Sequence, residues 1–100
     1  MSLFAVQYTY IDDAAARDAS RPAHRAYLGE LADAGTVVLS GPLAAVEGAP
    51  DAALIVVRAA SEADARARLA EDPFQVDGVV AQVDVRGWNP VLGELFAALA

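Results

Sequence analysis

The chain has 100 residues, of which 56% are hydrophobic, and this composition predicts a folded domain with a buried core instead of a disordered segment. The net charge is −7 and the seven basic residues are all arginine, so we expect neither nucleic acid nor a membrane as a partner. Disulfides and thiolate chemistry are excluded because cysteine is absent, and one histidine gives a metal site few ligands, so we expect no metal and no cofactor.

The N-terminal segment lacks the pattern of a secretory leader, and no apolar run is long enough to cross a membrane. We therefore expect a cytoplasmic protein. With no linker-like segment in the sequence, residues 1–100 are predicted to form a single domain.

The first part of the chain predicts a strand followed by a helix. Apolar and polar side chains alternate over residues 3–10, as in a half-buried strand. Residues 21–34 repeat apolar side chains at helical spacing. We expect Ser20 to cap this helix, Pro22 to lie in its first turn and Gly35 to end it.

The middle of the chain predicts two strands and a second helix. Residues 36–43 and 52–60 are expected to be antiparallel strands, joined by a loop rich in glycine and proline. Residues 61–72 predict a helix, because Ser61 and Asp64 have the spacing of a capping box and acidic residues precede arginines by four positions.

The last part predicts one more strand and a helical tail. Pro73 disfavours helical geometry at Asp72, so the second helix is expected to end there. Alternation over residues 78–88 predicts the fourth strand, with Val80 on the side that faces away from the helices. Residues 91–100 predict a short helix that packs on the domain, packs on a partner or frays.

This order of elements, βαββαβ, predicts a ferredoxin-like α+β fold, with a four-stranded antiparallel sheet and both helices on one face. In that topology the first helix begins at the edge of the sheet where the second helix ends. His24 and Asp72 are therefore expected to meet, near Tyr8 on the first strand and Ser40 on the second.

His24 and Asp72 are the candidate catalytic residues. His24 lies within the apolar arc of the first helix and Asp72 on the inner face of the second, so both point toward the core. The helix N-terminus disfavours a positive charge on His24, whereas a nearby carboxylate favours it. An aspartate that orients a histidine is the minimal general acid–base pair. The same spacing also fits a hydrogen-bonded pair with a purely structural role, and spacing alone does not separate the two.

Four further residues are candidate substrate contacts. Arg17 and Arg21, four positions apart, could clamp a carboxylate or a phenolate, or could form a solvated edge. Ser40 is a candidate hydroxyl donor, without the surroundings of a serine nucleophile. Tyr8 is a candidate aromatic contact or a core residue.

The sheet face away from the helices mixes polar side chains with apolar ones, most of all on the third strand. A partly apolar sheet face on a small domain is typical of an interface. We expect a homodimer packed sheet against sheet, related by a two-fold axis.

Residues 17–28 carry an R-x-x-x-R-x-x-H-x-x-Y-L pattern, and LSGPL and EDPF follow it. Together these motifs resemble the YCII-related (YciI-like) family over about residues 3–88. The resemblance implies a dimeric α+β barrel whose active site uses a His–Asp pair, here His24 and Asp72, with Arg17, Arg21 and Ser40 nearby.

One branch of this family dehydrochlorinates a chlorinated hydroxyquinol. The resemblance therefore implies a proton-transfer lyase or isomerase that needs no cofactor and acts on a small cyclic or anionic organic compound. The alternative is a noncatalytic dimeric protein that binds a small molecule.

Overall fold

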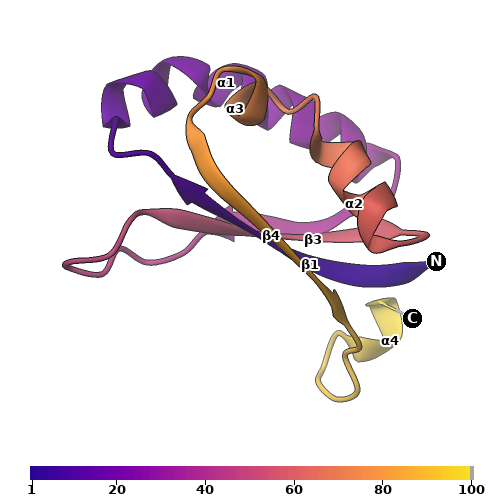
Figure 1. Cartoon of the computed structure of the whole chain (residues 1–100). Helices are drawn as coiled ribbons and strands as arrows, with labels where there is room; N and C mark the ends of the chain where they lie inside the picture. Colours follow the sequence, from indigo (N-terminus) through magenta and orange to yellow (C-terminus); the bar gives the residue numbers. More distant parts are fainter. Residues whose placement is uncertain (100) are drawn as a thin grey trace.

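The computed structural model describes residues 1–99 and confirms the predicted α+β fold, a four-stranded antiparallel sheet with the main helices on one face (Figure 1). In chain order the elements are β1 (Ser2–Tyr10), α1 (Ala14–Asp33), β2 (Val37–Pro42), β3 (Ala52–Ala59), α2 (Glu62–Leu69), α3 (Pro73–Val76), β4 (Val80–Trp88) and α4 (Phe96–Leu99). The strand order is β2-β3-β1-β4, as in the ferredoxin-like arrangement. The beginning of α1, the end of β2 and the segment after α2 consequently share one edge of the sheet.

The central strand β1 shows why the core lies between the sheet and the helices. Val6 and Tyr8 are fully buried on its inner side, whereas Gln7 between them is exposed. Near the end of β1 the pairing with β4 shifts register, between Thr9 and Tyr10. This irregularity turns Val80 toward the core, so the prediction that Val80 faces away from the helices was wrong.

Helix α1 begins seven residues earlier than the sequence indicates, which corrects the prediction that Ser20 is its N-cap. The cap is Asp13, whose side chain accepts from the backbone N–H of Ala16 at 3.0 Å. Ser20 is buried within the helix and donates to Asp77 at 2.7 Å. Pro22 lies in the helix interior and not in its first turn.

The ends of the two main helices follow their predicted signals more closely. Gly35 has φ +80°, as expected of the residue that ends α1. Ser61 caps α2 and accepts from the N–H of Asp64 at 3.0 Å. Helix α2 ends at Leu69, three residues before the predicted end, and Asp72 is the N-cap of the separate short helix α3.

The predicted tail helix begins five residues later than expected, at Phe96, and runs to Leu99 beside the N-terminus of the chain (Figure 1). Ala100, the last residue of the predicted tail, lies outside the described residues. Within residues 1–99, no helix combines the length and the apolar character needed to cross a membrane.

Candidate active site

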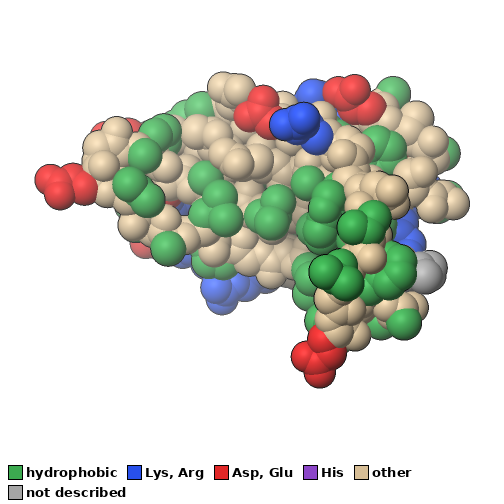
Figure 2. Space-filling view, turned by 90° about the horizontal axis from the view of Figure 1, so that it is seen from below, with side chains coloured by type: hydrophobic (Ala, Val, Ile, Leu, Met, Phe, Trp, Pro, Cys, Tyr) green, Lys and Arg blue, Asp and Glu red, His purple; other side chains and the backbone are tan. Residues whose placement is uncertain are grey.

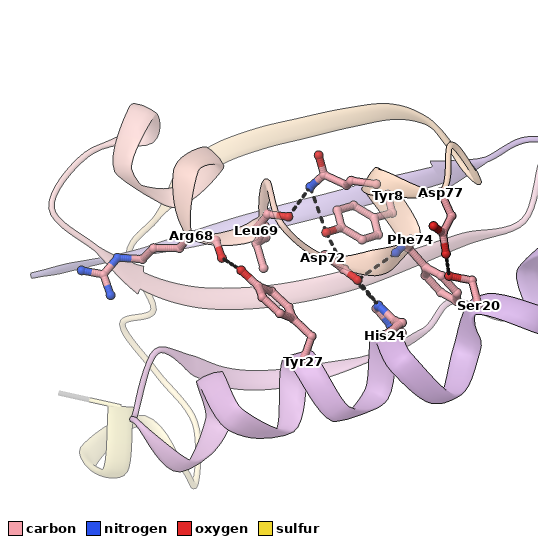
Figure 3. A network of polar contacts seen from close by, with 10 residues as sticks. Tyr8, Ser20, His24, Tyr27, Arg68, Leu69, Asp72, Phe74 and Asp77 are labelled. Carbon is pink, nitrogen blue, oxygen red and sulfur yellow. Dashed lines mark hydrogen bonds and ion pairs between the residues drawn. The ribbon is translucent and has the colours of Figure 1, made fainter.

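Asp72 is the centre of a buried polar network at the helix-covered side of the sheet (Figure 3). Its side chain is 0% exposed and accepts from three groups. The backbone N–H of Phe74 donates to Oδ1 at 3.0 Å and the hydroxyl of Tyr8 donates to Oδ2 at 2.8 Å. Nδ1 of His24 lies 2.8 Å from Oδ1 and 2.9 Å from Oδ2. A buried carboxylate is tolerated where such donors replace its hydration, so the network suits an ionised Asp72.

His24 projects from the middle of α1, so the expected influence of a helix N-terminus on its charge does not apply. An ionised carboxylate can only accept a hydrogen bond, so the contact with Asp72 favours the neutral tautomer that carries its proton on Nδ1 and leaves Nε2 unprotonated. The ring stacks on Phe74, with centroids 3.8 Å apart and planes 8° apart. The imidazole is therefore held both at its Nδ1 edge and on one face.

Tyr8 contacts Asp72 from the side away from His24 (Figure 3), and Gln75 in turn contacts Tyr8. Gln75 Nε2 donates to the Tyr8 hydroxyl at 3.0 Å and to the carbonyl of Leu69 at 2.9 Å. Burial raises the pKa of Tyr8 well above its ordinary value, and the charge of Asp72 adds to this effect against the hydrogen bond from Gln75. Tyr8 thus keeps its proton and donates to Asp72.

Two further contacts tie α1 to the chain segment that carries Asp72 (Figure 3). The buried Ser20 donates to Asp77 at 2.7 Å, and the hydroxyl of Tyr27 donates to the carbonyl of Arg68 at 2.6 Å. They flank His24 along α1 on its two sides, and so fix the helix against the segment that holds Asp72.

A cavity of about 540 Å³ opens beside His24, between α1 and the neighbouring ends of β2 and β3. Leu28, Ile55 and Phe74 form apolar parts of its wall. This volume lies within the range of small-molecule sites and suits a compound with one ring. Nδ1 of His24 faces the buried Asp72, and the His24 side chain, which is 12% exposed, borders the cavity.

Arg17, Arg21 and Ser40, three of the predicted substrate contacts, all border this cavity. Arg17 Nη2 is paired with Asp51 at 2.8 Å, and Arg21 is paired with Asp18. Both arginines therefore already have a carboxylate partner.

The fourth predicted contact, Tyr8, is placed differently. It is fully buried behind Asp72 and does not belong to the described residues that border the cavity. Its place is in the network that holds Asp72.

Sequence reasoning missed two residues of this region, Gln75 and Arg25. Gln75 lies three positions after Asp72, a spacing at which residues share one side of a helical turn. Arg25 borders the cavity although it lies outside the apolar arc of α1. Arginine recurs every four residues at positions 17, 21 and 25, and this spacing indicates that the three side chains lie along one side of the helix.

The chemistry available here is proton transfer. A histidine that has one nitrogen bound to a buried carboxylate and that borders a cavity has the arrangement of a general acid–base residue. Among the residues that the structure describes, no three histidine, aspartate or glutamate side chains gather into a set of metal ligands.

Comparison with known proteins gives a family and a set of similar structures. The family model of the YCII-related domain matches residues 2–89. Among solved structures, 5-chloro-2-hydroxyhydroquinone dehydrochlorinase (TftG) from Burkholderia phenoliruptrix AC1100, in complex with 2,5-dihydroxybenzoquinone, is similar with a TM-score of 0.72 and 25% identity, over 87% of this chain and 93% of that chain. No curated protein sequence matched the chain.

Two more distant structures share the fold. Rv0793 from Mycobacterium tuberculosis has a TM-score of 0.55 and 16% identity, over 93% of this chain and 99% of its own. A mutant of SnoaB, a cofactor-independent oxygenase from Streptomyces nogalater, has a TM-score of 0.54 and 12% identity, over 92% of this chain and 94% of its own.

Proposed function

The chain belongs to the YCII-related family, and from that membership and the geometry of the site we propose that it is a small-molecule enzyme in which His24 and Asp72 transfer a proton. The reaction is an elimination or an isomerisation of a small cyclic or anionic compound. One observation carries the proposal. His24 Nδ1 lies 2.8 Å from a fully buried carboxylate, while the His24 side chain borders a cavity of about 540 Å³.

In the proposed reaction, Nε2 of His24 removes a proton from a C–H or O–H bond of the bound ring. The electron pair of that bond moves into the ring, and a leaving group departs with the electrons of its own bond. In an isomerisation, Nε2 instead returns the proton to another atom of the ring. Asp72 orients the imidazole and stabilises the positive charge that forms on it. A positioned acid–base residue accelerates such steps by about 10²–10⁴-fold, and the steps need no cofactor.

The structural relative supports this type of reaction. TftG is named a dehydrochlorinase, and loss of hydrogen chloride removes one proton and one chloride ion. A His–Asp pair can supply the base for the proton, and the chloride leaves with its bonding electrons. We therefore choose 5-chloro-2-hydroxyhydroquinone as the first compound to test.

The test measures chloride release from that compound by the wild type, His24→Ala and Asp72→Asn, followed by a panel of one-ring carboxylates and phenolates. We expect each variant to lose at least about 10²-fold in kcat while circular dichroism shows a retained fold. Arg66→Gln, on an exposed face of α2, is the control and should keep wild-type turnover. Wild-type turnover in His24→Ala would refute the proposal. Binding without turnover of any compound would favour the noncatalytic alternative.

We also propose that the protein acts as a homodimer packed sheet against sheet. The sheet face away from the helices carries apolar side chains over much of its area (Figure 2). Leu39 on β2 is 54% exposed and Leu54 on β3 is 39% exposed on this face. Exposed apolar patches of this kind are typical of interfaces.

Analytical ultracentrifugation at micromolar concentration tests this interface. The wild type should sediment as a dimer, and Leu54→Glu should shift it to the monomer, because a charge on an apolar interface disfavours association. A monomeric wild type would refute the interface.

A further inference from the structure

The cavity beside His24 gathers positive charge in a protein that is otherwise acidic. Three of the seven arginines border it, together with a single carboxylate, Asp51, although the net charge of the chain is −7. A neighbouring cavity has the opposite balance, with three carboxylates and one arginine. The site of the proposed reaction is thus a place where an anion is favoured.

The three arginines are not equivalent. Arg17 is paired with Asp51, and its guanidinium carbon lies 4.8 Å from the ring centroid of Tyr10. Arg21 is paired with Asp18, one turn earlier on the same helix. Arg25 makes no ion pair and no side-chain hydrogen bond with any residue from 1 to 99. The charge of Arg25 is therefore not compensated by a carboxylate partner among these residues, and all of its donors are available to a ligand.

Arg25 also lies where a ligand of His24 would meet it. The two residues are consecutive on α1 and both border the cavity. The guanidinium is a planar group that binds carboxylates and similar oxyanions through two parallel hydrogen bonds. A one-ring compound can place an ionised substituent against Arg25 and another atom of the ring against His24.

We propose that Arg25 is the specificity-determining residue of the cavity, and that it selects one-ring compounds that carry an ionised oxygen substituent, such as a carboxylate or a phenolate. This assignment rests on the proposed function and narrows its substrate class. Arg17 and Arg21, held by Asp51 and Asp18, shape the positive wall, while Arg25 binds the anion directly.

The size of the effect follows from the exposure of Arg25. Its side chain is open to solvent, so water screens the interaction and the gain resembles that of an exposed ion pair, about fivefold in affinity. Because the exposed side chain makes no ion pair and no hydrogen bond with residues 1–99, we expect Arg25→Gln to melt at the wild-type temperature.

The experiment compares benzoate with its neutral isostere benzamide. Binding is followed by NMR through the imidazole protons of His24, which is the sole histidine and reports from within the cavity. We expect the wild type to prefer benzoate, Arg25→Gln to lose about fivefold in benzoate affinity with benzamide unchanged, and Arg25→Lys to keep part of the preference. Arg66→Gln, which removes the same charge from α2, should behave as the wild type.

An unchanged benzoate preference in Arg25→Gln, or no binding of benzoate to the wild type at millimolar concentration, would overturn the assignment. The outcome is separable from that of the proposed function. If turnover survives His24→Ala while the anion preference depends on Arg25, the proton-transfer mechanism fails and the anion site stands. If turnover requires His24 while the preference survives Arg25→Gln, the anion site fails and the mechanism stands.

Discussion

Asp72→Asn should destabilise the protein and inactivate it together, because the substitution keeps the shape of the side chain and removes an acceptor. Oδ1 accepts from the N–H of Phe74 and Oδ2 accepts from the hydroxyl of Tyr8. An amide at this position has one oxygen and one NH₂ group, so in either orientation one of these two donors loses its acceptor.

The number of donors left without an acceptor determines how much the free energy of unfolding falls. A buried donor without an acceptor costs about 1–3 kcal/mol, and in a domain of this length each kcal/mol lowers Tm by about 4–8 °C. The amide also has no charge to stabilise the imidazolium. It can donate to Nδ1 of His24, which moves the imidazole proton to Nε2 and removes the base from the cavity.

Thermal denaturation and kcat measured on the same preparation of Asp72→Asn test this reasoning. We expect Tm to fall by at least about 4 °C and kcat by at least about 10²-fold. Asp77→Asn is the matched control, since Asp77 is exposed and an amide oxygen can still accept from Ser20. A wild-type Tm and kcat in Asp72→Asn would show that the network does not hold the carboxylate as described.

Two further predictions concern tyrosine and aspartate titrations. Tyr8→Phe should lower the free energy of unfolding by about 1–3 kcal/mol at neutral pH, since it removes a donor to Asp72 and an acceptor of Gln75. Burial raises the pKa of Tyr8 above its ordinary value of 10.0, so this tyrosine ionises at a lower pH in the unfolded chain than in the folded one. The free energy of unfolding of the wild type therefore falls as the pH rises above 10.0. Urea unfolding should show a smaller loss of stability over this pH range in Tyr8→Phe than in the wild type. The backbone N–H of Ala60 and the guanidinium of Arg68 lower the pKa of Asp64 below 3.8, which stabilises the fold above that pH. Asp64→Asn should therefore lower Tm at neutral pH. The Tm values of the variant and the wild type should converge as the pH falls and the carboxyl of folded Asp64 becomes protonated. A difference in Tm that does not change with pH would contradict this cause.

The topology and the meeting of His24 with Asp72 could be predicted from the sequence. Both follow from alternation in the strands and helical spacing in the helices, which are properties of short segments. Once the order of elements fixes the direction of each strand, the fold brings together two residues that are 48 positions apart. Local patterns and the order of elements therefore predict that the two residues meet, although Asp72 lies beyond the end of α2 and His24 in the middle of α1.

The beginning of α1 and the surroundings of Asp72 could not be predicted in this way. Ser20 has the chemistry of an N-cap, but its hydroxyl binds Asp77, 57 positions away, and the helix begins at a competing cap. Asp72 has helical spacing with α2, yet its side chain caps the next helix and accepts from Tyr8 on β1. In both cases a contact made only in the folded chain prevails over a local signal.

The property that distinguishes Arg25, its lack of a carboxylate partner among residues 1–99, also depends on the folded structure. Its spacing with Arg17 and Arg21 is visible in the sequence, but the partners of those two arginines are not. Asp51 reaches Arg17 from the loop before β3, 34 positions away. These pairings leave Arg17 and Arg21 with carboxylate partners and Arg25 without one among residues 1–99.

The protonation of the two ring nitrogens of His24 tests the central claim most directly. The ¹⁵N chemical shifts of the single histidine can be measured in the neutral imidazole, without a substrate. A pair that works as proposed has its proton on Nδ1, bound to Asp72, and a bare Nε2 on the side of the cavity. A proton on Nε2 would contradict the account, because His24 would then present a donor where the proposed reaction needs a base.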